Sequence, residues 1–370
     1  MTALLVSLLL QVLTSGSKAD QGDNAILVPA VPRCPRCRIV LRPITVLGER
    51  DTSMTEVPQS LDIDERGRYY AALPNKHELP LVYAANGKLL KRIGRQGDGP
   101  GEFRLPAHIF VDAHDTVFIA DWAGRLSVLT PDYRFARSFA FPTGTRALIV
   151  LSNGRVLANA SRPDRETIGL PFHLFDRTGV FLGAIGDRSR PFFSTSSYTI
   201  VHRIAPTKTG FWSVPAFGNY LIEHWSQDGK RTMLLRRTPN WFVTLPQGLS
   251  GKNPFTTDPP VSVVEGLWED SKGLLWVMIR TADPARHEVP AETVRTPEGN
   301  VSVPGEPDRV SDTIVEVIDP KAGILLVSQR FDQLFIRSMK GGRIAHIREN
   351  SNGIIAVEIL ELRLSPGPAP

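Results

Sequence analysis

The chain has 370 residues, of which 42% are hydrophobic, and this apolar content excludes a generally disordered protein. Glycine and proline contribute 30 residues each without a collagen period, which indicates many short elements separated by turns. The formal net charge is +5, and the basic residues are dispersed, so the sequence lacks the basic arm typical of nucleic-acid-binding proteins.

The N-terminal residues are typical of an exported protein. Residues 3–13 are apolar but too few to span a bilayer, which takes about 20 residues. Small residues follow and end at Ala19 in a pattern similar to a signal cleavage site, although no basic residue precedes the apolar run. We therefore predict a signal peptide over residues 1–19, a periplasmic or secreted location and no stable membrane anchor.

Residues 20–37 form an N-terminal segment that carries the two cysteines, Cys34 and Cys37, in the sequence Cys-Pro-Arg-Cys. In an exported protein this spacing favours a local disulfide that closes a tight turn. A redox-active dithiol would need a βαβ context, and a zinc site would need two further ligands nearby. The sequence shows neither context, and both remain alternatives to the disulfide.

An internal repeat organises the rest of the chain. Residues 58–97 and 106–143 align, with Leu61–Asp64 matching Ile109–Asp112. Each unit contains four short apolar runs separated by turn residues, which predicts four antiparallel strands.

Four looser units follow at residues 147–185, 203–235, 263–329 and 334–364. The last unit supplies only three strands, and Arg38–Leu47 is an apolar run without a partner in the first unit. A radial β array must close to protect its edges, so we predict that this N-terminal strand completes the last blade. The fold expected is an all-β, six-bladed β-propeller with four-stranded antiparallel blades, a single domain over 38–364 and a flexible tail at 365–370.

The segment Arg95–Phe103 (RQGDGPGEF), followed by Phe118–Asp121 and Arg125–Leu129, resembles an NHL repeat. Its glycines allow the positive φ angles needed where the chain crosses between blades. From Arg38 onward the chain resembles the exported bacterial six-bladed β-propeller proteins related to NHL-repeat proteins. The first two blades carry this resemblance, and the other four match it in pattern only.

Loop lengths differ between the two faces of the predicted ring. The turns on one face are short, whereas the long segments fall on the other face, over blades three to five. These long segments are Ser161–Pro171, Asp187–Tyr198, Arg237–Ser262 and Thr281–Asp312. Long segments in compact folds are usually functional or disordered, and their concentration on one face predicts a binding surface there.

The starts of the first strands bring polar residues toward the axis at the same face. The predicted binding residues are Arg104, His108, Arg146, Arg203 and Arg337, joined by Asp121 and Trp122 from a second-to-third-strand loop. Arginine is well suited to carboxylate or phosphate, so an anionic ligand fits this set.

Two histidines and a glutamate suggest a metal site as a further hypothesis. His108, His202 and Glu265 come from three blades and could bind a divalent ion such as zinc, which would activate water. However, the two histidines lie one register apart, and side chains alternate along a strand, so the rings need not face the same way. No other cofactor is indicated.

The sequence contains no P-loop, no Gly-x-Ser-x-Gly motif and no His-Glu-x-x-His motif. We therefore predict an exported, non-catalytic binding propeller that holds a peptide, glycan or protein. The alternative is a metal-dependent lyase or hydrolase with its site at the mouth of the central channel. Nucleic-acid binding is disfavoured by the dispersed charge and by the predicted export.

Overall fold

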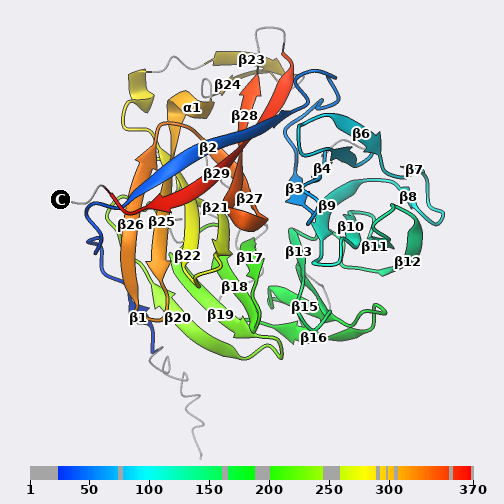
Figure 1. Ribbon diagram of the computed structural model, residues 1–370, viewed down its shortest axis with the longest axis horizontal. Coiled ribbons are helices and arrows are strands. Elements are labelled where there is room, and N and C mark those ends of the chain that lie inside the picture. The colour runs from blue at the N-terminus through cyan, green and yellow to red at the C-terminus, as the bar shows by residue number, and fades with distance from the viewer. Residues whose placement is uncertain are drawn as a thin grey trace, which may run out of the picture.

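The computed structural model describes residues 24–73, 78–160, 166–187, 201–244, 259–288, 292–296, 299–303, 307–349 and 353–367. Six sheets, each with four strands of the propeller, surround a central axis (Figure 1). Strands within a blade pair antiparallel in chain order from the axis outward, except in the last blade. The predicted six-bladed β-propeller is confirmed.

The six innermost strands lie around the axis and contact one another in sequence. They are β3 (Ser60–Ile63), β9 (Pro106–Val111), β13 (Ala147–Val150), β17 (His202–Pro206), β21 (Val263–Glu269) and β27 (Phe335–Met339). The second strands are β4 (Tyr69–Ala72), β10 (Val117–Asp121), β14 (Val156–Asn159), β18 (Gly210–Pro215), β22 (Leu275–Ala282) and β28 (Arg343–Glu349).

The two outer positions complete each blade. The third strands are β5 (Leu81–Tyr83), β11 (Arg125–Leu129), β15 (Phe172–Phe175), β19 (Leu221–Ser226), β25 (Ser311–Asp319) and β29 (Ile355–Ser365). The outermost strands are β6 (Leu89–Arg92), β12 (Phe135–Ala140), β16 (Phe181–Ile185), β20 (Arg231–Arg236), β26 (Ile324–Phe331) and β2 (Arg38–Leu47).

The second strands of the first two blades are mostly apolar and fully buried because both faces of a blade pack against neighbouring blades. Every residue of β4 and of β10 is buried, whereas β12 at the outer edge is mostly exposed. A continuous short apolar run bounded by turns is the pattern of a strand buried on both faces. The hydrophobic clusters accordingly lie between blades, as where Phe172 contacts Phe211 of the next blade at 5.3 Å between ring centroids.

The ring closes through the N-terminal strand, as predicted. Strand β2 pairs antiparallel with β29, from Arg38 opposite Ser365 to Leu47 opposite Val357, and so becomes the outermost strand of blade six. The inner strand of that blade, β27, contacts β3 of blade one. The two ends of the propeller sequence therefore share one sheet, which locks the ring.

Residues 26–34 extend along the outer edges of blades four and five. Strand β1 (Ile26–Leu27) pairs parallel with β20, which makes the sheet of blade four five-stranded. Further on, the Arg33 amide donates to the Leu325 carbonyl at 2.8 Å. The Cys34–Cys37 disulfide closes a turn between this segment and β2, and Cys37 packs in the core between blades five and six. The N-terminal segment is thus part of the folded domain.

A buried arginine fixes this segment in place. Arg237 donates through Nε to Glu316 Oε2 at 2.9 Å and through Nη2 to the other carboxylate oxygen. Its Nη1 donates to the carbonyls of Val28 and Pro29 at 3.3 and 2.9 Å. The Tyr220 hydroxyl donates to the same Glu316 carboxylate at 3.0 Å. One guanidinium therefore joins blade four, blade five and the N-terminal segment.

Blade five carries an insertion between its second and third strands. It contains the 3-10 turn η3 (Arg286–Glu288), the hairpin of β23 (Glu292–Thr296) and β24 (Gly299–Val303), and the short helix α1 (Pro307–Val310). Asp308 of α1 contacts the ring of His346 in blade six at 2.8 Å. The insertion therefore packs against the neighbouring blade.

The glycine-rich crossing from blade one to blade two contains the short parallel pair β7 (Arg95–Gln96) and β8 (Glu102–Phe103). Gly97 has φ of +143°, and a Cβ atom there would collide with the Glu102 side chain. A second 3-10 turn, η4 (Lys340–Gly342), follows β27.

Several predicted segments lie wholly or partly outside the described residues. They are the signal peptide at 1–19, most of Asp187–Tyr198, much of Arg237–Ser262, part of Ser161–Pro171 and the end of the 365–370 tail. In the part of the chain that the structure describes, no helix has the length and apolar character needed to cross a membrane.

Candidate functional site

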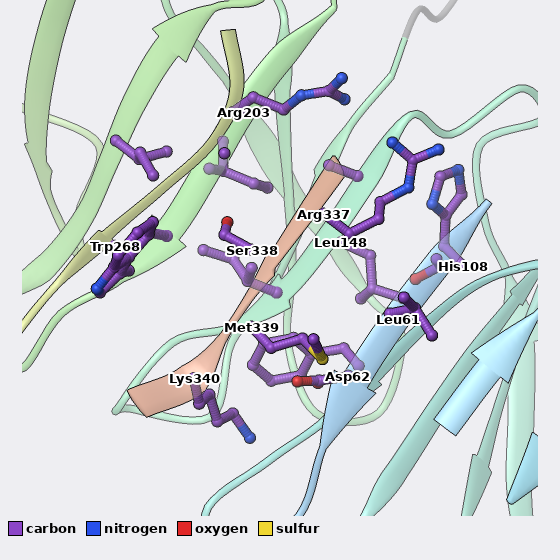
Figure 2. A pocket seen from close by; sticks show the side chains of 18 of the residues that line it. Leu61, Asp62, His108, Leu148, Arg203, Trp268, Arg337, Ser338, Met339 and Lys340 are labelled. Atoms are coloured by element: carbon purple, nitrogen blue, oxygen red, sulfur yellow. The ribbon is translucent and has the colours of Figure 1, made fainter. Parts of the chain in front are cut away.

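A cavity of about 450 Å³ lies on the central axis, with lining residues from the inner strands of all six blades. This volume is in the range of pockets that bind small molecules. Figure 2 shows that Arg203, Arg337 and His108 lie toward one end of the cavity, whereas Asp62 and Lys340 lie toward the other.

Five polar side chains at the first of these ends make up what we call the channel mouth. Each comes from the first half of an inner strand or from the residue just before it: His108, Arg146, Arg203, Glu265 and Arg337. The inner strands all begin at the same face of a propeller, which is why residues far apart in the sequence meet here. The structure therefore brings together five residues that the sequence analysis had assigned to binding or to metal.

Two of the five residues occupy β-bulges. Glu265 lies between the pairs made by Val264 and Gly266 and has no partner of its own in β22. Arg337 lies in the same position between Ile336 and Ser338, and its φ of +52° is unusual for a residue other than glycine. Bulges redirect side chains, and backbone strain that a fold retains is common at functional sites. Both observations indicate Glu265 and Arg337 as candidate functional residues at the channel mouth.

The Glu265 carboxylate is enclosed by arginines. Arg203 Nη2 lies 3.0 Å from Oε2, Arg280 Nη2 lies 3.2 Å from Oε1, and Arg337 Nη1 lies 3.9 Å from Oε2. The carboxylate is almost fully buried, with 5% of its side chain exposed. Burial by itself would raise the pKa of Glu265, but the three guanidinium groups outweigh it and lower the pKa. Glu265 is therefore ionised at neutral pH.

Positive charge exceeds negative charge at the mouth. One carboxylate faces the three arginines around Glu265, and Arg146 adds a fourth guanidinium to the lining. Desolvation, followed by repulsion from Arg203, lowers the pKa of Arg337 to about 10, so this side chain stays charged at pH 7. The pocket thus holds surplus positive charge in a poorly hydrated place, where electrostatic attraction to an anion is strong.

His108 is neutral in this setting. Burial, and then the positive charge of Arg337, lower the pKa of His108 to about 3. One of its ring nitrogens is hydrogen-bonded to the Thr145 backbone, while Nε2 has no partner among the described residues. The Nε atoms of Arg146 and Arg337 also lack partners there. Buried polar groups are nearly always hydrogen-bonded, so these three nitrogens are available to a polar ligand.

Three predicted binding residues lie elsewhere. Arg104 is exposed and pairs with Asp98 in the glycine-rich crossing. The Asp121 carboxylate accepts hydrogen bonds from the backbone amides of Arg104 and Ala123 at 2.7 and 2.8 Å, so its role is to hold the loop. Trp122 donates its backbone amide to Leu105, and it does not line the cavity. These three had been expected at the mouth because their strand ends lie on that face.

Within the described residues, the three predicted metal ligands do not come together at one place. His202 packs edge-on against Phe172, with ring centroids 5.1 Å apart, and it does not line the cavity. Glu265 is held by arginines whose positive charge opposes a cation. Across the described residues, no three His, Cys, Asp or Glu side chains are close enough to hold a metal ion. His108 and His202 thus have different surroundings, in keeping with their difference in register.

Sequence reasoning missed Arg280 and Lys340. Arg280 belongs to the second strand of blade five, opposite Val263, and reaches Glu265 from behind the inner strand. The position of Arg280 directly after the apolar run Leu275–Ile279 is the feature of the sequence that could have indicated it. The sequence does not show how β22 aligns with β21, so the contact of Arg280 with Glu265 could not be predicted. Lys340 follows β27 and lies at the far end of the cavity, with its ammonium group 5.0 Å from the Phe110 ring.

Comparisons with known proteins identify the fold. A family model described as a six-bladed β-propeller matches residues 61–130. Among curated proteins there is no match.

Two solved structures are similar to the chain. The "Putative exported protein" of Bacteroides fragilis has a TM-score of 0.61 and 12% identity, over 92% of this chain and 99% of that one. A gluconolactonase of Xanthomonas campestris has a TM-score of 0.45 and 12% identity, over 90% of this chain and 91% of that one. The similarity to the first of these structures supports the propeller fold and establishes no activity.

Proposed function

We propose that the protein is an exported binding propeller whose channel mouth holds an anionic group of its ligand. The observation that carries the proposal is the surplus of arginines around the single carboxylate of Glu265. A guanidinium presents its donors in a planar fork that matches carboxylate and phosphate oxygens. The Nε atoms of Arg146 and Arg337, which have no hydrogen-bond partner among the described residues, supply donors for such a group.

The long segments over blades three to five support a ligand that extends beyond the mouth. Ala147 pairs with Asn159, so the connection after β14 leaves from the face where β13 begins. Val263 pairs with Arg280 at the start of β21, so the insertion of blade five leaves from the same face. A peptide, glycan or protein with an acidic group would contact these segments while that group enters the mouth.

Export and the relation to NHL-repeat proteins are part of the same proposal. The apolar N-terminal run and the Cys34–Cys37 disulfide support export, because disulfides persist in oxidising compartments. Residues 95–129 support the NHL relation: Arg125 donates to the Asp98 carbonyl and braces the glycine-rich crossing.

Thermal stabilisation by inorganic phosphate tests the binding proposal. A ligand that binds only the folded state stabilises it by RT ln(1 + L/Kd), where L is the free ligand concentration, so the rise in melting temperature with ligand concentration reports the affinity. We expect phosphate to stabilise the wild type and Arg146→Gln to weaken its apparent affinity about tenfold or more, as for loss of one hydrogen bond to a charged group. Arg146 makes no ion pair with the described residues, so the melting temperature without phosphate should change little.

The matched control is Arg134→Ala, which removes the same charge from the exposed turn between β11 and β12. It should leave the phosphate effect intact. Equal loss in both variants would show a non-specific salt effect, and no phosphate effect in the wild type would contradict an anion site.

A further inference from the structure

Beyond the channel mouth, the lining of the cavity changes from charged to apolar. Its wall there is formed by apolar side chains from the inner strands of all six blades: Leu61, Phe110, Leu148, Ala205, Leu267, Trp268 and Met339. All of these residues are buried. Figure 2 shows Leu61, Leu148 and Met339 between the end with Arg203 and Arg337 and the end with Lys340. The cavity is thus a charged mouth joined to an apolar channel.

The charged groups at the far end are already paired within the protein. Lys340 donates to the Val111 carbonyl and lies over the Phe110 ring. Asp62 accepts hydrogen bonds from the amides of Ile63 and Val111 at 2.8 and 2.7 Å. Burial raises the pKa of Asp62, and the positive charge of Lys340 counteracts this shift. Because both groups are hydrogen-bonded to the backbone and their opposite charges offset each other, these two residues offer no surplus positive charge to a second acidic group.

Building on the proposed function, we infer that the ligand group held here is an amphipathic organic acid, with one acidic head and an apolar body. The head lies among Arg146, Arg203 and Arg337, and the body extends along the channel past Leu148 and Met339. The arginines fix the orientation, because the opposite placement would bury the acidic head against an apolar wall without hydrogen bonds. The apolar wall supplies affinity in proportion to the area of ligand that it removes from water.

A series of straight-chain carboxylates tests this inference by titration calorimetry. We expect acetate to bind weakly, and butyrate, hexanoate and octanoate to bind progressively more tightly. The gain should approach about fourfold per methylene, the value for full burial of a CH₂ group. Hexyl phosphate shows whether a phosphate head substitutes for the carboxylate. Adipate, which adds a second carboxylate to a chain of the same length, should bind more weakly than hexanoate.

Leu148→Phe separates the head from the body of the ligand. The larger side chain narrows the channel beside Leu61, so octanoate should lose affinity at least tenfold while phosphate binding is retained. Phosphate binding in the variant reports that it has folded, and the chain-length series on the wild type does not depend on it.

The outcomes for the two proposals are distinct. If phosphate binds but affinity is independent of chain length, the amphipathic ligand is wrong and the anion site stands. If octylamine binds as well as octanoate, the acidic head and the anion site are both wrong.

Discussion

Replacing Arg237 with alanine is expected to lower the free energy of unfolding by about 3–5 kcal/mol, the usual cost of removing one partner of a buried ion pair. The Arg237 side chain is 1% exposed and Glu316 is 0% exposed, so the substitution leaves a buried carboxylate without its counter-charge. The Tyr220 hydroxyl alone cannot compensate that charge. The carbonyls of Val28 and Pro29 lose their donor as well.

The measurement is denaturant unfolding, combined with limited proteolysis of residues 24–37. We expect earlier unfolding and faster cleavage of this segment, since its attachment to blade four depends on Arg237. The control is the triple variant Arg237→Met, Glu316→Leu, Tyr220→Phe, which replaces the charged cluster with apolar groups. It should recover most of the stability, because such replacements are often neutral. An Arg237→Ala protein as stable as the wild type would contradict the assignment.

Glu265→Gln is the second substitution with a large expected effect. It removes the one carboxylate that the described residues place at the channel mouth and leaves Arg203, Arg280 and Arg337 facing one another. We expect a loss of about 3–5 kcal/mol at low ionic strength. The variant should also bind phosphate more tightly than the wild type does, because an added anion takes over the role of the carboxylate. Phosphate should therefore restore much of the lost stability.

The matched control is Glu223→Gln in blade four. Glu223 also forms an ion pair with an arginine, at 2.9 Å from Arg231, but away from the cavity. This variant should lose stability without any specific rescue by phosphate. If phosphate rescues both variants equally, or neither, the channel mouth is not an anion site.

The fold could be predicted from the sequence because the turn residues and apolar runs that determine it lie close together in the chain and recur along it. An aspartate at the turn after the inner strand, as at Asp64 in blade one, recurs as Asp112 in blade two, and short buried strands flank these turns. Strand Arg38–Leu47 was placed correctly because a ring with an open edge is unstable. In contrast, Ile26 and Leu27 gave no signal, since a two-residue strand with exposed side chains has no pattern.

The site was readable only in part, because the direction of a side chain depends on local register. Starting positions of inner strands correctly placed His108, Arg146 and Arg203 on the cavity. Irregularities in strand pairing determine where other side chains point. Arg337, for example, reaches the cavity from a β-bulge that no residue pattern in the sequence indicates. Arg104 precedes the inner strand of blade two by two residues, and its exposed side chain pairs with Asp98 instead of lining the cavity.

Arg337 combines a positive charge, a strained backbone conformation and a donor without a partner among the described residues. Its replacement therefore tests most directly the central claim, that the channel mouth binds an anion. Arg337→Gly removes the guanidinium and the cost of φ at +52°, since glycine adopts positive φ freely. In calorimetric titrations with inorganic phosphate, we expect this variant to bind at least tenfold more weakly than the wild type while its melting temperature stays the same or rises. Unchanged phosphate affinity in a folded Arg337→Gly protein would contradict an anion site at the channel mouth.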